Sequence, residues 1–75
     1  MRYTIIKGVD TDFNLEITGD VDIICAVMEI STRGSGLTYE ADLTGAEIIK
    51  LLSPFKVDLD GILPNKNYTI TAYDW

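Results

Sequence analysis

The chain has 75 residues, which is the length of one small domain, and we expect a single β-rich domain spanning residues 1–75. It contains one cysteine and no histidine, so an internal disulfide is excluded and a metal site would have to use carboxylates. Domains of this size often gain stability from a disulfide, a metal or a partner. With the first two nearly excluded, we expect the protein to be oligomeric or part of an assembly.

The net charge of −6 is unevenly placed along the chain. No basic residue lies between Lys7 and Arg33, and this span holds the acids Asp10, Asp12, Glu16, Asp20, Asp22 and Glu29. Direct binding to nucleic acid is not expected, because it needs clustered Lys and Arg. Two interpretations stay open: the acidic span between residues 8 and 32 is a binding surface for a basic partner, or it is a solvated face that keeps the protein soluble.

The sequence shows no membrane segment. The first seven residues lack the apolar core of a signal peptide, and no apolar stretch approaches the ~20 residues that span a bilayer. We therefore expect a protein made in a cytoplasm that does not contact a membrane. Cys25 lies in the apolar run Ile23–Val27 and is expected to be a buried thiol.

The first part of the chain predicts strands. Residues 3–7 read as one strand, and the alternation over residues 13–18 predicts a half-buried second strand. Gly19-Asp20 fits a two-residue hairpin link. Residues 21–31 are apolar at both odd and even positions, which predicts a central strand that is covered on both sides or is covered on one side by another chain.

In the middle of the chain, the spacing of apolar residues changes from that of a strand to that of a helix. Residues 33–36 predict a flexible turn, and residues 37–43 alternate as a strand. Thr44 and Glu47 then form a capping box for a helix over residues 45–52, which ends at Ser53-Pro54. Phe55, Val57 and Leu59 alternate with polar residues and predict another short strand.

The C-terminal segment predicts the last strand. After Leu63-Pro64 and a polar turn, the alternation from Tyr68 predicts a buried Tyr68 ring whose hydroxyl bonds back to the preceding turn, with Thr69 and Thr71 peripheral. Tyr73 falls on the opposite face, and Trp75 follows it. We expect one or both at an interface, where such residues are enriched; a Trp75 folded over its own core is the alternative.

These elements add up to six strands and one short helix. The expected fold class is mainly β, a small antiparallel β-sandwich with one short helix. The alternative is an α+β fold in which one helix packs across an antiparallel sheet.

No catalytic or cofactor-binding constellation is found, and neither an enzyme nor a bound cofactor is expected. Three Asp-x-Asp pairs raise the possibility of calcium, which binds oxygen ligands. The segment from Asp10 begins like an EF-hand loop, but Leu15 stands where the turn glycine belongs and Val21 where the bidentate Glu belongs. No metal site is therefore predicted.

The segment Leu63-Pro64-x-x-x-Tyr68-x-Ile70-x-Ala72 resembles the entry to the penultimate strand of Ig-like or fibronectin-type domains. The opening, from Ile5 through Gly8 and Phe13 to Ile17, is similar to Ig-like modules of phage appendage proteins such as head fibres and baseplate components. Two features depart from that family: the chain ends where a final strand is expected, and a capped helix replaces a strand connection. Two explanations stay open: a partner chain supplies the missing edge, or the fold is instead a compact α+β sheet with one helix packed across it.

The resemblance implies a small virion protein that decorates a capsid or adapts a tail or fibre, with itself or a larger virion protein as partner. The competing hypothesis is a small acidic phage-encoded inhibitor of a nucleic-acid-binding or defence protein, located in the host cytoplasm. The candidate interface residues under either hypothesis are Asp10, Asp12, Glu16, Asp20, Asp22, Tyr73 and Trp75.

Overall fold

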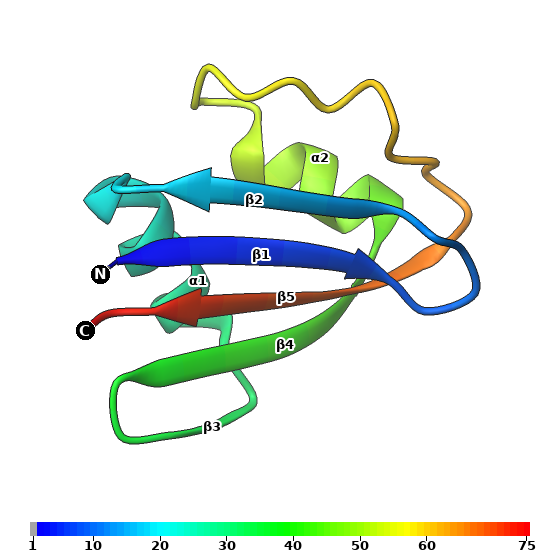
Figure 1. Ribbon diagram of the computed structural model, residues 1–75. Helices are drawn as coiled ribbons and strands as arrows, with labels where there is room; N and C mark the ends of the chain where they lie inside the picture. Colours follow the sequence, from blue (N-terminus) through cyan, green and yellow to red (C-terminus); the bar gives the residue numbers. More distant parts are fainter. Residues whose placement is uncertain (1) are drawn as a thin grey trace.

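The computed structural model describes residues 2–75, which form one antiparallel sheet with two helices on the same face (Figure 1). The strands are β1 (Tyr3–Gly8), β2 (Asn14–Thr18), β3 (Arg33–Ser35), β4 (Thr38–Thr44) and β5 (Asn67–Tyr73); the helices are α1 (Val21–Ile30) and α2 (Gly45–Leu52). The strand order is β2-β1-β5-β4-β3, and every neighbouring pair is antiparallel. The expected small β-rich fold is confirmed, in the form of one antiparallel sheet with packed helices.

The core lies between the helices and one face of the sheet. Ile70 of β5 is the partner of Ile6 on β1 and of Ala41 on β4, so one row of apolar side chains crosses the middle of the sheet. All three are buried, together with Tyr68 on the same face of β5. Because side chains alternate along a strand, the residues between them lie on the opposite face, which no helix covers.

Helix α1 corrects the expectation of a central strand over residues 21–31. Asp20 is its N-cap, because its carboxylate accepts a hydrogen bond from the Ile23 N–H at 3.2 Å. Ile23, Ile24 and Val27 are buried against the sheet, a spacing that suits a helix. The predicted hairpin link at Gly19-Asp20 is likewise wrong: Gly19 turns the chain with a φ of 76°, but into a helix.

The change from strand to helix also moves Cys25. In a helix, the positions that face the sheet are taken by Ile23, Ile24 and Val27, which leaves Cys25 on the outer side. Its side chain is exposed, so the expectation of a buried thiol is wrong.

Helix α2 confirms the predicted cap. The Thr44 hydroxyl accepts from the Glu47 N–H at 3.2 Å, and the Glu47 carboxylate accepts from the Thr44 N–H at 2.8 Å. Ile48 and Leu52 of this helix are buried in the core. The predicted start and end of the helix are both observed.

Residues 53–66 form a long connection that contains no strand, so the strand expected over residues 55–59 is wrong. Phe55, Val57 and Leu59 are half-buried and pack against the edge of the core. The Asp58 carboxylate accepts from the Asp60 N–H at 3.1 Å, which turns the chain locally. The alternation of apolar residues here reflects packing without strand pairing.

The last strand, β5, lies between β1 and β4 at the centre of the sheet. The expectation that the C-terminal strand leaves an unpaired edge is therefore wrong, and the edges are β2 and β3. Arg33–Ser35, predicted as a flexible turn, is the short edge strand β3. Neither helix of the part described, residues 2–75, is long and apolar enough to cross a membrane.

Candidate functional site

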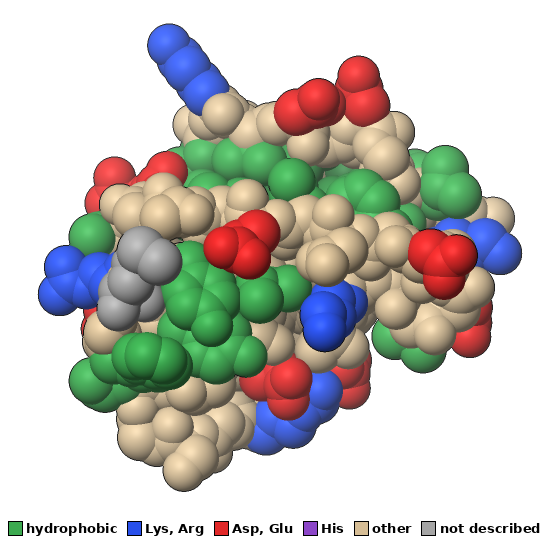
Figure 2. All heavy atoms as spheres, in the orientation of Figure 1, with side chains coloured by type: hydrophobic (Ala, Val, Ile, Leu, Met, Phe, Trp, Pro, Cys, Tyr) green, Lys and Arg blue, Asp and Glu red, His purple; other side chains and the backbone are tan. Residues whose placement is uncertain are grey.

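The uncovered face of the sheet is the candidate site, and we call it the open face. Alternation and register bring to it Tyr3, Ile5 and Lys7 of β1, Thr69, Thr71 and Tyr73 of β5, Thr38, Glu40 and Asp42 of β4, and Glu16 of β2. Both helices lie behind the sheet in Figure 1, so the open face is turned toward the viewer there and in Figure 2. Hydrophobic side chains gather on it near the two chain ends, and the rest of the face is mainly polar (Figure 2).

The hydrophobic end of the open face is an aromatic cluster, defined here as Tyr3, Tyr73 and Trp75. Tyr3 and Tyr73 are register partners on neighbouring strands, and their rings stack with centroids 4.5 Å apart. The Trp75 ring is nearly perpendicular to that of Tyr73, with the ring centroids 6.0 Å apart. The Trp75 side chain is 58% exposed, so it is not folded over the core. Three rings are thus held in fixed mutual orientations at the surface.

A shallow hollow of about 150 Å³ lies beside the aromatic cluster in the middle of the open face. It is lined by Ile5, Lys7, Glu40, Thr69, Thr71 and Tyr73. Thr71 is only 8% exposed, although the sequence predicted it to be peripheral; neighbouring side chains on the open face cover it. Lys7 is exposed and makes no ion pair within residues 2–75. The hollow therefore presents the Lys7 ammonium group, the Glu40 carboxylate and two threonine hydroxyls.

The other half of the open face carries a polar network that links β3, β4 and β5. The Arg33 guanidinium makes two hydrogen bonds of 2.8 Å to Asp42 and a further one to Glu40. Thr69 donates to Asp42 and Thr71 donates to Glu40, each at 3.1 Å. The network fixes these side chains in one arrangement.

The same network shifts two pKa values. The hydrogen bonds from the guanidinium hold the pKa of Asp42 below its ordinary value of 3.8. The hydrogen bond to Asp42, followed by that to Glu40, raises the pKa of Arg33 above its ordinary range. Both side chains are substantially exposed, so solvent screening limits what this pairing adds to stability.

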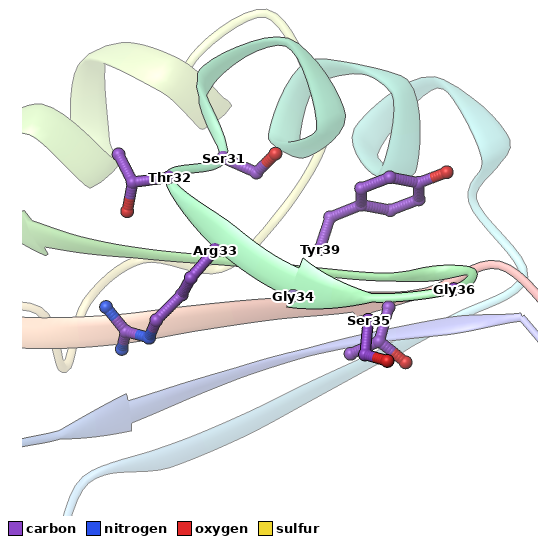
Figure 3. Close-up of a pocket in the computed structure, with 8 residues that line it drawn as sticks. Ser31, Thr32, Arg33, Gly34, Ser35, Gly36 and Tyr39 are labelled. Carbon is purple, nitrogen blue, oxygen red and sulfur yellow. The ribbon is translucent and has the colours of Figure 1, made fainter.

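A second hollow, of about 300 Å³, lies between the end of α1 and the β3–β4 hairpin (Figure 3). Its lining includes Ser31, Thr32, Ser35 and Tyr39. Figure 3 shows the Arg33 side chain turned away from the Tyr39 ring, in keeping with its bonds to Glu40 and Asp42 on the open face. The lining contains hydroxyl groups but no carboxylate, thiol or imidazole, so it offers no acid–base pair.

The structure brings together only part of the predicted interface. Tyr73 and Trp75 are in contact on the open face. Asp10 and Asp12 lie in the β1–β2 loop, whereas Asp20 and Asp22 lie at the other end of the hairpin, where α1 begins. Glu16 projects from β2 between these two ends. The predicted acids are therefore dispersed along the hairpin and do not form one patch.

Carboxylates do not gather in a way that suggests a metal centre. Within the described span of 2–75, no three Cys, Asp or Glu side chains lie close enough to hold a metal ion. Asp20 and Asp58 instead accept hydrogen bonds from nearby backbone N–H groups. This is the local role that short acidic side chains often have at helix starts and turns.

Sequence reasoning missed most contributors to the open face, among them Tyr3, Ile5 and Lys7 of β1. The alternation of residues 3–7 shows which of them share a face. It does not show that β1, Tyr3–Gly8, pairs with β5, Asn67–Tyr73, at the far end of the sequence. Comparison with protein-family models, curated proteins and solved structures found no match to this chain.

Proposed function

We propose that this chain is a small, non-catalytic interaction protein that binds a protein partner through the open face of its sheet. The observation that carries the proposal is the aromatic cluster, in which the Tyr73 ring contacts both Tyr3 and Trp75 on a face that no helix covers. Tyr and Trp are enriched at protein interfaces, and they often supply the residues that contribute most to binding.

The arrangement of the cluster favours binding at low entropic cost. Tyr73 is stacked on Tyr3 and meets the Trp75 ring at a near-perpendicular angle, so its ring already has two aromatic neighbours before a partner arrives. Ordering a side chain on binding costs about 0.5–1.5 kcal/mol, and a pre-ordered ring avoids part of that cost. The adjoining hollow is lined by both the Lys7 ammonium and the Glu40 carboxylate, so it offers a partner charged groups of both signs.

A protein is the partner class that fits this surface best. The chain carries a net charge of −6, which opposes association with nucleic acid. The open face combines an apolar end with a hydrogen-bonded polar half, a mixture typical of protein interfaces. The sequence resemblance to phage appendage modules adds a location: we propose that the partner is a virion protein, either a second copy of this chain or a larger component.

Particle incorporation tests the proposal. Particles assembled with the wild type, with Trp75→Ala combined with Tyr73→Ala, or with Met28→Ala are purified, and their content of this protein is measured by mass spectrometry. Met28 is the matched control, because it is an exposed apolar residue on α1, behind the sheet. Thermal melts first establish that all three proteins are folded.

We expect wild type and Met28→Ala in the particles and the double variant depleted at least tenfold, since losing an aromatic hot spot costs ~2 kcal/mol or more. Equal incorporation of all three proteins would overturn the proposed interface. Absence of the wild type from particles would overturn the virion location. If the wild type were absent from particles and inhibited a DNA-handling enzyme in a salt-sensitive way, the acidic-inhibitor hypothesis would replace the virion proposal.

A further inference from the structure

The sheet has two edges, and they differ in their capacity to pair with another strand. Edge strands present unpaired backbone N–H and C=O groups to the surroundings. The β3 edge has only three residues and contains Gly34, whose φ of 146° departs from strand geometry. The β2 edge, Asn14–Thr18, is five residues long. It is the more complete template of the two.

The hydrogen bonds that flank β2 show which of its backbone groups are unpaired. Gly8 N–H donates to the Phe13 carbonyl, and Gly19 N–H donates to the Arg2 carbonyl, both at 2.9 Å. Hydrogen-bonded and non-hydrogen-bonded pairs alternate along an antiparallel ladder. Leu15 and Ile17 therefore direct their backbone groups toward β1, and the three exposed residues that direct theirs outward are Asn14, Glu16 and Thr18. No other segment within 2–75 hydrogen-bonds the backbone of these three.

The side chains of β2 indicate the chemistry of a matching strand. Glu16 projects to the open-face side, and Leu15 and Ile17 are half-buried on the helix side. An added strand would place one residue opposite Glu16 and its two neighbours beside Leu15 and Ile17. A cation opposite Glu16 and apolar groups at the neighbouring positions complement these side chains.

We propose that the β2 edge accepts an extended segment of a partner protein as an additional antiparallel strand, with Lys or Arg opposite Glu16 and apolar residues on either side. A second copy of β2 fits poorly, because the register that uses all three outward residues sets Glu16 against Glu16 of the other copy. This surface is distinct from the aromatic cluster, so either proposal can fail while the other holds.

Short peptides test strand addition directly. The probe is a soluble nine-residue peptide with Val-Lys-Val at its centre and Ser and Thr on both sides; the matched control has Val-Glu-Val. Amide hydrogen exchange of the full chain is measured by NMR with each peptide. We expect the Val-Lys-Val peptide to slow exchange at Asn14, Glu16 and Thr18, with little change at Leu15 and Ile17, which already bond to β1.

Two methylated peptides and one protein variant make the test specific. Methylating the Lys backbone nitrogen of the peptide should abolish binding, whereas methylating a neighbouring Val nitrogen should not, since only the former faces β2. Glu16→Lys should reverse the preference and favour the Val-Glu-Val peptide about fivefold, because cross-strand charges of like sign repel. The proposal is overturned if neither peptide protects the outward amides, if both methylated peptides bind equally, or if protection falls on Arg33–Ser35.

Discussion

The phenolic oxygen of Tyr68 accepts a hydrogen bond from the backbone N–H of Leu63, with a nitrogen–oxygen distance of 2.8 Å. The contact ties the long connection after α2 to the start of the central strand, β5. The same connection also caps α2, because the Gly45 and Ala46 N–H groups donate to the carbonyls of Lys66 and Pro64. A segment without strands is thereby fixed to both the sheet and a helix.

The first prediction concerns this contact. Tyr68→Phe should lower the free energy of unfolding by about 0.5–1.5 kcal/mol, because the Leu63 N–H loses its acceptor. Tyr68→Ala should cost ~3–5 kcal/mol, since the ring is buried in the core. Tyr39→Phe is the control, as the Tyr39 hydroxyl has no hydrogen bond within residues 2–75. Urea denaturation measures all three, and equal losses for the two Phe variants would contradict the assignment.

The second prediction concerns the start of α2. Thr44→Ala should destabilise the protein by ~0.5–2 kcal/mol, because the Glu47 N–H loses its cap. Glu47→Ala removes the reciprocal hydrogen bond, and a double-mutant cycle should show coupling between the two residues. Strictly additive losses would mean that the capping box does not act as a unit. Thr18→Ala, at an exposed position of β2, is the control.

The third prediction distinguishes helix α1 from a central strand. Cys25 is exposed on the outer side of α1, so a thiol reagent should label it in the native protein at a rate close to that of an unfolded control. Asp20→Ala should cost ~1 kcal/mol through loss of the N-cap, whereas Asp22→Ala removes no cap. Labelling of Cys25 only on unfolding would contradict the helix.

The fourth prediction concerns acid stability. Because the folded-state pKa of Asp42 lies below its ordinary value of 3.8, its charged form stabilises the fold at higher pH. That contribution is lost as the pH falls through the folded-state pKa. The melting temperature of Asp42→Asn should therefore lie slightly below that of wild type at neutral pH, and the two should converge in strong acid. If the difference in melting temperature between Asp42→Asn and wild type grew as the pH fell, the pairing of Asp42 with Arg33 would be contradicted.

Much of the fold could be predicted from the sequence, because β2, β4 and β5 alternate clearly and α2 begins with a capping box. The run Ile23–Val27 was misassigned because a short apolar run suits a buried strand and a buried helix equally. Asp20, followed by an acid in the first turn, was the signal that would have favoured a helix. Residues 55–59 alternate without a pairing partner, which no local pattern can reveal.

The candidate site was predicted only in part, because the pairing of segments distant in sequence is not visible in a local pattern. Tyr73 and Trp75 were identified from their own strand, since parity places Tyr73 opposite the buried Tyr68. Tyr3 completes the aromatic cluster only through the pairing of the first and last strands. The acidic residues were grouped by their proximity in sequence, but the β1–β2 hairpin separates Asp10 and Asp12 from Asp20 and Asp22.

Site-specific photocrosslinking tests the proposed interface most directly. A benzophenone amino acid replaces Trp75 in one protein and Met28 in another; both positions are exposed and apolar, but only Trp75 lies on the open face. After irradiation of assembled particles, the account predicts a covalent adduct between position 75 and an identified virion protein, and none from position 28. An adduct from position 28 alone, or none from position 75 in particles that contain the protein, would contradict it.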